Sequence, residues 1–323
     1  MSYDWQARVS QAAQRTATLV SRTPVIQWPQ SPTWLKLENT QVTGSFKARG
    51  GGHKLASLSA SARALGVVTA SSGNHGAGVA HAGEALGCPV MVFVPEGADP
   101  SKVSRIRALG AQVQTHGTDC VQTEAHARAW AAQHGRIYVS PYNDIDVIAG
   151  QGTIGLELLE QVPNLARVYV SVGGGGLISG VGGYLKAVRP EIEVIACSPQ
   201  RSPAMHACLQ AGEIIDVECE ETLSDATAGG VEPDAVTFEL CQAVIDRSEL
   251  VSEAEIAAAM RLVHQTLSIE IEGAAGVAMA VYLREQSRQQ GAHCAVIICG
   301  GNIAADTLER VLDHRPPTGH RTG

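Results

Sequence analysis

The sequence has few lysines, no paired cysteines and no long apolar run, and each shortage argues against a class of protein. Basic residues number 24 against 32 acidic ones, for a net charge of −8, which argues against a nucleic-acid partner. No apolar run reaches membrane-spanning length, and the N-terminus lacks a signal-peptide pattern. The eight cysteines contain no C-x-x-C pair, which favours the reducing cytoplasm over a disulfide framework or a zinc site.

The pattern of apolar runs predicts an α/β fold. Short apolar segments at residues 67–70, 89–94, 168–172 and 194–197 alternate with helix-like segments, among them residues 152–161 and a helix opened by a capping box at Ser252. Continuous apolar strands that alternate with helices are typical of parallel sheets covered on both faces. A chain of 323 residues is long enough for two domains. We therefore predict two open, twisted, mostly parallel sheets flanked by helices. The tail at residues 315–323 is predicted to be disordered.

Among only five lysines, Lys47 is the best candidate for chemistry. A lysine that forms a Schiff base must lose its proton, so it should lie in a pocket. Lys47 lies between small residues and an aromatic ring in residues 43–50. Lys36 is expected on the face opposite Leu35 and Leu37, because its segment alternates. Lys102 follows Asp99-Pro100, which predicts a helix start, and is expected in the solvated first turn of that helix. Lys54 and Lys186 are expected in helix-like stretches without chemical neighbours.

Four consecutive glycines at residues 173–176 follow one predicted strand and open a predicted helix. Glycines at such a place let backbone N–H groups close around a phosphate at the positive end of the helix. The G-x-G-x-x-G spacing of dinucleotide sites fails, because Ser179 stands three residues after Gly176. A purely structural turn stays open as an alternative. We predict a phosphate cradle formed by Gly173, Gly174, Gly175 and Gly176.

Residues 71–76 follow the predicted strand at 67–70, at the edge where open α/β sheets bind ligands. N–H groups and serine hydroxyls in this loop suit a carboxylate. The alternative is a serine- and asparagine-rich turn that caps the next helix.

Six segments of the chain, taken together and in order, resemble the motifs of the serine/threonine dehydratases. These are pyridoxal-phosphate (PLP) enzymes of the tryptophan-synthase-β fold, or fold type II, a group that also includes serine racemases. The segments are residues 35–50, 71–76, 147–153, 173–176, 272–275 and 299–302. The resemblance implies PLP in a cleft between a large domain, residues 1–54 and 146–323, and a small inserted domain, residues 55–145. It also implies a homodimer.

The resemblance assigns roles to individual residues. Lys47 would carry PLP and remove the Cα proton, with Ser72 facing the substrate from the opposite side. Asn74 would contact the cofactor's 3-hydroxyl oxygen, and Cys299 would stand beside the pyridine nitrogen. Glu272, an acid among small apolar residues, is counted with the cofactor-binding residues, although it could simply interact with a helix dipole. The complete predicted set is Lys47 and Ser72 as catalytic residues; Phe46, Lys47, Asn74, Gly173, Gly174, Gly175, Gly176, Glu272 and Cys299 around the cofactor; and Ser71, Ser72, Gly73, Asn74 and His75 around the substrate.

Departures from the family pattern limit what can be inferred. Ser198 and Ala204 stand where metal-binding members carry acids, so no metal site is predicted. Ala77 and Ser140 replace a common glutamine and a common histidine. These changes leave the substrate open among serine, threonine, a bulkier aryl-serine such as phenylserine, and 3-hydroxyaspartate, and no extra cation near the motifs favours the last.

We therefore predict a PLP-dependent ammonia-lyase that converts a β-hydroxy L-amino acid into a 2-oxo acid and ammonia by β-elimination. An amino-acid racemase or epimerase that uses Lys47 and Ser72 as opposed bases is the first alternative. A β-replacement enzyme is the second, although its lysine motif usually reads differently from Ser-Phe-Lys-Ala-Arg. A non-enzymatic binding protein would leave Lys47 and Asn74 idle.

Overall fold

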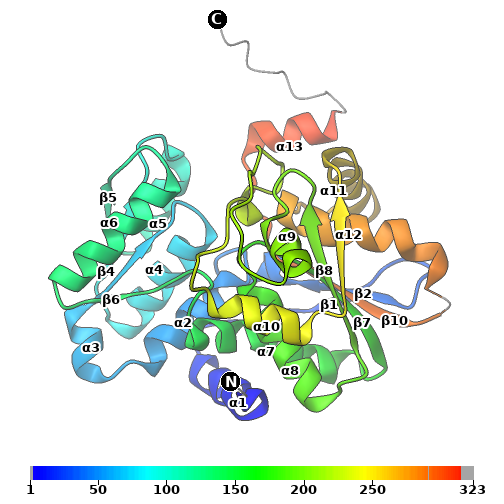
Figure 1. Ribbon diagram of the computed structural model, residues 1–323, viewed down its shortest axis with the longest axis horizontal. Coiled ribbons are helices and arrows are strands. Elements are labelled where there is room, and N and C mark those ends of the chain that lie inside the picture. Colours follow the sequence, from blue (N-terminus) through cyan, green and yellow to red (C-terminus); the bar gives the residue numbers. More distant parts are fainter. Residues whose placement is uncertain (1–2, 290, 314–323) are drawn as a thin grey trace, which may run out of the picture.

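The computed structural model describes residues 3–289 and 291–313, which form two sheets surrounded by helices (Figure 1). The six-stranded sheet has the order β1-β2-β10-β7-β8-β9, and the four-stranded sheet has the order β5-β4-β3-β6. β1 pairs antiparallel with β2, while the other pairs in both sheets are parallel. The strands are β1 (Val25–Gln27), β2 (Thr33–Leu37), β3 (Val67–Ala70), β4 (Val90–Val94), β5 (Gln112–Thr115), β6 (Ile137–Tyr138), β7 (Leu165–Ser171), β8 (Glu193–Pro199), β9 (Arg247–Val251) and β10 (His293–Ile298).

Helices cover the sheets, as the alternating pattern predicts. They are α1 (Trp5–Thr16), α2 (Lys47–Ser57), α3 (Ala60–Leu65), α4 (Asn74–Leu86), α5 (Pro100–Ala108), α6 (Cys120–Gln133), α7 (Ile145–Gln161), α8 (Gly176–Val188), α9 (Ala204–Ala211), α10 (Val236–Val244), α11 (Glu253–Leu267), α12 (Gly273–Glu285) and α13 (Ala305–Leu312), with the 3-10 turns η1 (Glu38–Thr40), η2 (Asp225–Thr227) and η3 (Gln286–Arg288). The α/β prediction is confirmed. In the part of the chain that is described, no helix is long and apolar enough to cross a membrane.

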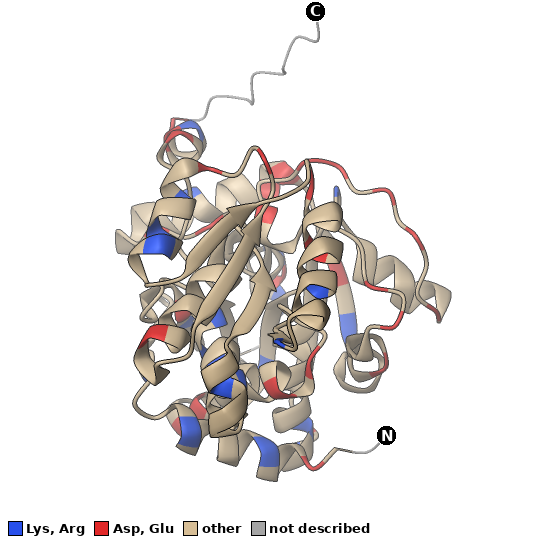
Figure 2. Cartoon of the chain, turned by 90° about the vertical axis from the view of Figure 1, so that its left-hand side faces the viewer, with Lys and Arg blue, Asp and Glu red and all other residues tan. Residues whose placement is uncertain are grey.

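Each sheet has its own hydrophobic core. The four-stranded sheet packs around residues such as Val67 and Val92, and the six-stranded sheet around residues such as Val170 and Val296. Figure 2 shows the interior strands largely in tan, whereas charged residues lie mainly on helices and loops. The four strands of the smaller sheet all fall within residues 55–145. The division into domains at residues 54 and 146 stays a prediction.

Parallel strands direct three chemically important loops toward the same region. The loop at residues 71–73 follows β3, the glycines at 173–175 follow β7, and Cys299 follows β10. The start of α2 is attached to the end of β10, because Phe46 N donates to Cys299 O at 3.0 Å and Ser45 forms a β-bridge with Gly300. The fold therefore brings the lysine segment and all three loops to one cleft.

The face of β2 that carries Lys36, opposite Leu35 and Leu37, is buried rather than open to solvent. Lys36 and Glu38 are both fully buried at 0% exposure. Lys36 Nζ donates to Glu157 at 2.5 Å, and Arg49 donates to Glu38 and Glu157 at 2.7 and 2.6 Å. Since β2 lies between β1 and β10 and α7 supplies Glu157, the polar face of β2 is covered by protein. An alternating pattern on such a strand does not mark a solvent face.

Some element boundaries also differ from expectation. α7 begins at Ile145, before the expected start at residue 152, because the Asp144 side chain caps it by accepting from Asp146 N and Val147 N.

Lys54 and Lys186 have acidic neighbours, although none was expected. The Nζ atom of Lys54 lies 2.7 Å from Asp144, and that of Lys186 lies 2.7 Å from Asp246. The capping box predicted for α11 at Ser252 is present. The tail at residues 315–323, predicted to be disordered, lies outside the described residues.

The buried Arg49 cluster yields a stability prediction. Arg49→Leu leaves the buried Glu38 carboxylate without its cation and leaves Glu157 with Lys36 alone. The free energy of unfolding should therefore fall by about 3–5 kcal/mol. Arg22→Leu is the control, because the Arg22–Glu160 pair is about half exposed and should contribute no more than about 1 kcal/mol. Urea denaturation measures both changes. Equal losses in the two variants would show that the buried cluster has no special weight.

Candidate active site

A single cavity of about 420 Å³ contains every residue of the predicted site. Its volume falls within the usual range for small-molecule sites. The predicted residues that line it are Phe46, Lys47, Ser71, Ser72, Gly73, Asn74, His75, Gly173, Gly174, Gly175, Gly176, Glu272 and Cys299. The structure thus brings together segments more than 200 residues apart in the chain. Their individual roles stay predictions.

Lys47 is the first residue of α2 and is half-buried. Its Nζ donates to Pro141 O at 2.9 Å and lies 5.1 Å from the centroid of the Phe46 ring. Burial lowers the pKa of Lys47 to about 8, although Cys299 and Glu272 act in the opposite direction. The amine therefore gives up its proton far more readily than an exposed lysine, as a nucleophile or base must.

The four glycines form a tight turn whose space would not admit larger side chains. Gly175 has φ of +86°, and a Cβ on Gly174 would stand 2.5 Å from the Tyr142 ring. A Cβ on Gly173 would meet the backbone of Thr227 at 2.9 Å. The turn leads into α8, whose first N–H groups have no acceptor within the helix. This arrangement suits an anionic group such as the phosphate of PLP.

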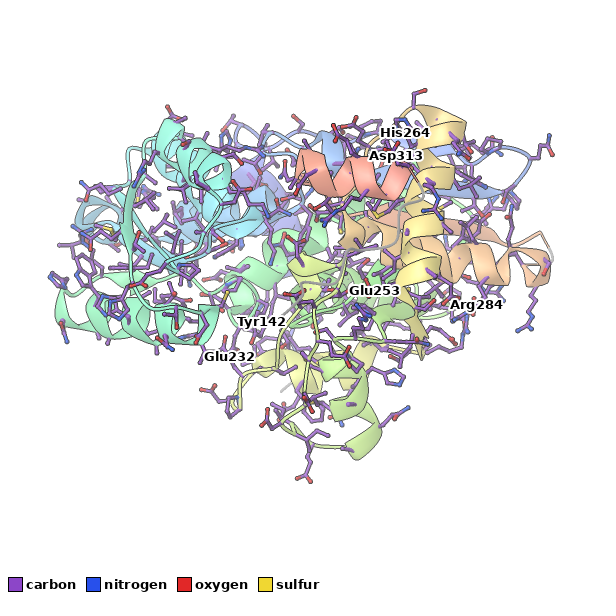
Figure 3. All side chains as sticks on the ribbon, turned by 90° about the horizontal axis from the view of Figure 1, so that it is seen from above. Tyr142, Glu232, Glu253, His264, Arg284 and Asp313 are labelled. Carbon is purple, nitrogen blue, oxygen red and sulfur yellow. The ribbon has the colours of Figure 1, made fainter. Side chains whose placement is uncertain are left out.

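Tyr142 closes the turn from the other side and was not identified from the sequence. Its hydroxyl accepts a hydrogen bond from Glu232 N at 3.1 Å, and Figure 3 shows the two residues side by side. Burial and Glu232 raise the pKa of Tyr142, so this hydroxyl stays protonated at neutral pH. No motif signal marked Tyr142, because its position depends on how the loop after β6 meets the glycines.

Asn74 and Glu272 meet across the cavity. Asn74 begins α4, and its Nδ2 donates to the two carboxylate oxygens of Glu272 at 3.1 and 2.9 Å. Burial raises the pKa of Glu272 to about 7, while the hydrogen bond from Asn74 lowers it. The Cys299 thiol lies 3.9 Å from Glu272, and burial raises the pKa of that thiol well above its usual value. Cys299 is thus a neutral thiol.

His75 is buried and neutral. One ring nitrogen, Nε2, lies 3.0 Å from Val139 O, which fixes the proton on that nitrogen. Burial and the nearby Lys47 lower the pKa of His75 to about 3. This geometry suits a structural histidine rather than a base. In the same loop, Ser71 Oγ accepts from Gly73 N at 3.2 Å.

The expectation that no further cation lies near the motifs is wrong, because Lys102 and Arg105 of α5 also line the cavity. Lys102 Nζ lies 3.2 Å from Asp225, and Arg105 donates to Asn302 at 2.5 Å. The start of α5 at Asp99-Pro100 was predicted from its cap, which the structure contains. The sequence did not reveal which face of the helix turns toward the cleft.

The positions of the family's metal ligands hold no acid. Ser198 Oγ donates to Val172 O at 3.2 Å, and Ala204 begins α9. Across residues 3–289 and 291–313, no group of three or more His, Cys, Asp or Glu side chains forms a candidate metal site.

The family model described as pyridoxal-phosphate dependent enzyme matches residues 16–300, so the chain belongs to that family. It is 42% identical to the L-threonine ammonia-lyase of Thermotoga maritima over 282 residues, which are 87% of this chain and 69% of the relative. The processed threonine deaminase isoform 2 of Solanum lycopersicum has a similar structure, with a TM-score of 0.91, 29% identity and coverage of 96% and 86% of the two chains. Maize serine racemase gives a TM-score of 0.89 at 29% identity, with coverage of 96% and 97%.

These similarities confirm the predicted membership of the serine/threonine dehydratase group, fold type II and PLP as the cofactor. They also bear out the prediction of a PLP-dependent ammonia-lyase. The glycine turn, the low-pKa lysine and the neutral thiol around one cavity are a donor set that fits this cofactor.

Glu272 yields a pH prediction. Its pKa rises from 4.5 to about 7 on folding, so between these values the native protein keeps a proton that the unfolded chain releases. The free energy of unfolding should therefore fall by roughly 3 kcal/mol as pH rises through this window. Glu272→Gln should remove that loss. Urea titrations at pH 4.5 and 8 compare it with wild type and with Glu84→Gln, an exposed control on α4. An identical pH slope in wild type and Glu272→Gln would contradict the assignment.

Proposed function

We propose that this protein eliminates the β-hydroxyl of L-threonine and L-serine, yielding the 2-oxo acid and ammonia. The observation that carries the proposal is the Lys47 amine, with a pKa of about 8, in the same cavity as the serine-rich loop and the glycine turn. A base, a carboxylate site and a phosphate site are the three parts that such a reaction requires. Relatives named L-threonine ammonia-lyase and L-threonine dehydratase support the choice of substrate.

The residues present can hold PLP at four points. Lys47 would bond its aldehyde carbon, the turn at 173–176 would hold its phosphate, Asn74 would face its 3-hydroxyl oxygen, and Cys299 would stand beside its ring nitrogen. When bound, PLP supplies an electron sink for the bonding electrons of the Cα–H bond. The neutral thiol of Cys299 would leave the ring nitrogen unprotonated and the sink modest, which favours prompt loss of the β-hydroxyl.

The chain's own groups would orient the substrate and move its proton. Ser71, Ser72 and the N–H groups of residues 73–75 would hold the α-carboxylate, so that the Cα–H bond points at Lys47 Nζ. Lys47, released when the substrate amine takes its place on the cofactor, would then take the Cα proton as the general base. The β-hydroxyl would leave as water with the proton that Lys47 took from Cα, and hydrolysis of the released enamine would give the 2-oxo acid and ammonia.

Racemisation is the second candidate, because Ser72 lines the cavity together with Lys47 and could return a proton to the opposite side of Cα. The similarity to maize serine racemase points the same way. 3-Hydroxyaspartate is disfavoured, because the two cations of α5 that line the cavity already have partners: Lys102 bonds Asp225, and Arg105 bonds Asn302 and Thr43 O.

Three further features belong to the proposal. The four-stranded sheet would belong to the small domain at residues 55–145, and the six-stranded sheet to the large domain formed by the rest.

The family resemblance supports a homodimer, which analytical ultracentrifugation measures. Eight free cysteines fit a reducing cytoplasm, which fractionation of the source cells would test.

The proposed reaction is tested by following 2-oxo acid and Cα deuterium together in heavy water. The holoenzyme should form 2-oxo acid from L-threonine and L-serine faster than from phenylserine or 3-hydroxyaspartate, with little deuterium in recovered substrate. Elimination should outpace return of the proton because Cys299 is neutral. Rapid exchange and loss of optical activity without 2-oxo acid would instead identify a racemase.

Lys47→Ala should remove both the base and the covalent attachment of the cofactor. Turnover should fall at least about 1,000-fold, while the melting profile of the protein without cofactor stays near wild type. Borohydride reduction of the wild-type holoenzyme and peptide mapping should place the pyridoxyl group on Lys47. Lys186→Ala is the control and should retain activity. A label on Lys36 or Lys54 would refute the assignment.

A further inference from the structure

Four polar side chains form a continuous hydrogen-bonded chain along the cavity wall. Arg105 Nη1 donates to Asn302 Oδ1 at 2.5 Å, and Asn302 Nδ2 donates to Asn74 Oδ1 at 2.6 Å. Asn74 Nδ2 in turn donates to Glu272 at 3.1 and 2.9 Å. All four residues line the cavity. The chain begins at a group that can only donate and ends at a carboxylate that can only accept when ionised.

The Arg105 end fixes the direction of both amides between the two ends. Arg105 has only N–H donors, so Asn302 must present its oxygen to it. Asn302 Nδ2 then donates to Thr43 O at 2.9 Å as well as to Asn74 Oδ1. If the Asn302 amide were reversed, its oxygen would face two acceptors and its nitrogen would face a guanidinium. Only one orientation satisfies every partner.

The backbone around Asn302 is shaped for this orientation. Gly44 has φ of +69°, and a Cβ there would lie 2.6 Å from Asn302 Oδ1. Glycine at residue 44 therefore leaves room for the amide oxygen beside Arg105. Arg105 Nη2 also donates to Thr43 O at 2.8 Å, so the same short segment holds both side chains.

We propose that Arg105 and Asn302 are positioning residues that hold the Asn74 amide with its nitrogen, not its oxygen, toward Glu272 and the cofactor site. The inference rests on the proposed function, in which Asn74 donates to the 3-hydroxyl oxygen of PLP. An amide nitrogen carries two N–H groups, so Asn74 can serve Glu272 and the cofactor together. With the amide reversed, Asn74 would turn an acceptor toward two oxygens that also accept.

The test compares Asn302→Asp with Asn302→Ala in the holoenzyme. Asp keeps the shape of Asn and its contact with Arg105, but it cannot donate to Asn74 Oδ1, so it should favour the reversed Asn74 amide. Ala only removes the constraint. We expect the dissociation constant for PLP to rise about tenfold or more in Asn302→Asp, with a shifted near-visible maximum of the bound cofactor, and less in Asn302→Ala. If Asn302 served stability alone, Asn302→Ala would raise the dissociation constant more than Asn302→Asp, because Ala deletes more packing. That result would overturn the inference.

Variants of α5 provide the matched controls. Arg105→Ala should weaken PLP binding and shift the spectrum in the same direction as Asn302→Ala, and Arg105→Lys, which keeps a donor-only head group, should recover part of the effect. Arg107→Ala alters an exposed arginine on the same helix outside the cavity lining and should change neither readout. Equal effects of Arg105→Ala and Arg107→Ala would show that only the charge of the helix matters.

A double-mutant cycle separates this inference from the proposed role of Asn74. Asn74→Ala alone should weaken PLP binding, and adding Asn302→Asp to it should then have less than about a twofold further effect, since Asn302 acts through Asn74. If Asn74→Ala changes neither readout, the proposed cofactor role of Asn74 is wrong and this inference falls with it. If Asn302→Asp keeps its full effect without Asn74, the positioning inference alone is overturned.

Discussion

The buried Arg49 guanidinium holds the lysine segment in place. Its Nε and both terminal nitrogens donate to Glu38, Glu157 and Thr153, and the residue is only 1% exposed. Removing such charges from water is costly. The cost is offset only when the oppositely charged partners are well placed and the N–H donors of the cation are hydrogen-bonded. The cluster meets this condition while joining the end of β2 to α2 and α7.

Lys47 depends on this cluster through helix geometry. It stands two residues before Arg49 in the first turn of α2, and residues two apart on a helix point in nearly opposite directions. With Arg49 held in the protein interior, Lys47 is turned toward the cavity. The bond from Phe46 N to Cys299 O fixes the same turn from its other side. The ionic cluster thus controls the direction of a lysine that it does not contact.

Burial shifts the titratable groups at the centre of the site toward their neutral forms. Burial makes Cys299 a neutral thiol and His75 a neutral imidazole, and it moves the pKa values of Lys47 and Glu272 to about 8 and about 7. Anionic groups of ligands would therefore meet N–H dipoles in the glycine turn and in the loop after β3. Such preorganised dipoles are effective in a cavity that excludes water.

The sequence correctly predicted those segments whose residue pattern matches their place in the folded protein. The apolar runs at 67–70 and 168–172 became buried strands, and the glycine run became a turn at the start of a helix because side chains there would collide with Tyr142 and Thr227. β9 was missed because its residues Arg-Ser-Glu-Leu-Val are mostly polar, as suits a strand at the sheet edge.

Other misses come from contacts that no local pattern encodes. Lys36 has the alternation of a half-exposed strand, yet α7 places Glu157 over it. The cap at Asp99 located α5 correctly but did not indicate that Lys102 and Arg105 face the cleft. Both errors concern which face of an element another element covers. That property depends on the assembled fold rather than on the segment.

The cleft itself explains why Asn74 needs support from the opposite side. Asn74 and Arg105 lie on helices next to the four-stranded sheet, whereas Asn302 and Glu272 lie on segments that follow β10 or precede α12. The bonds among them cross the cleft in both directions. Separation of the two sheets would break these bonds together and leave the Asn74 amide free to turn. The orientation of the Asn74 amide is thereby tied to the contact between the two sides of the cleft.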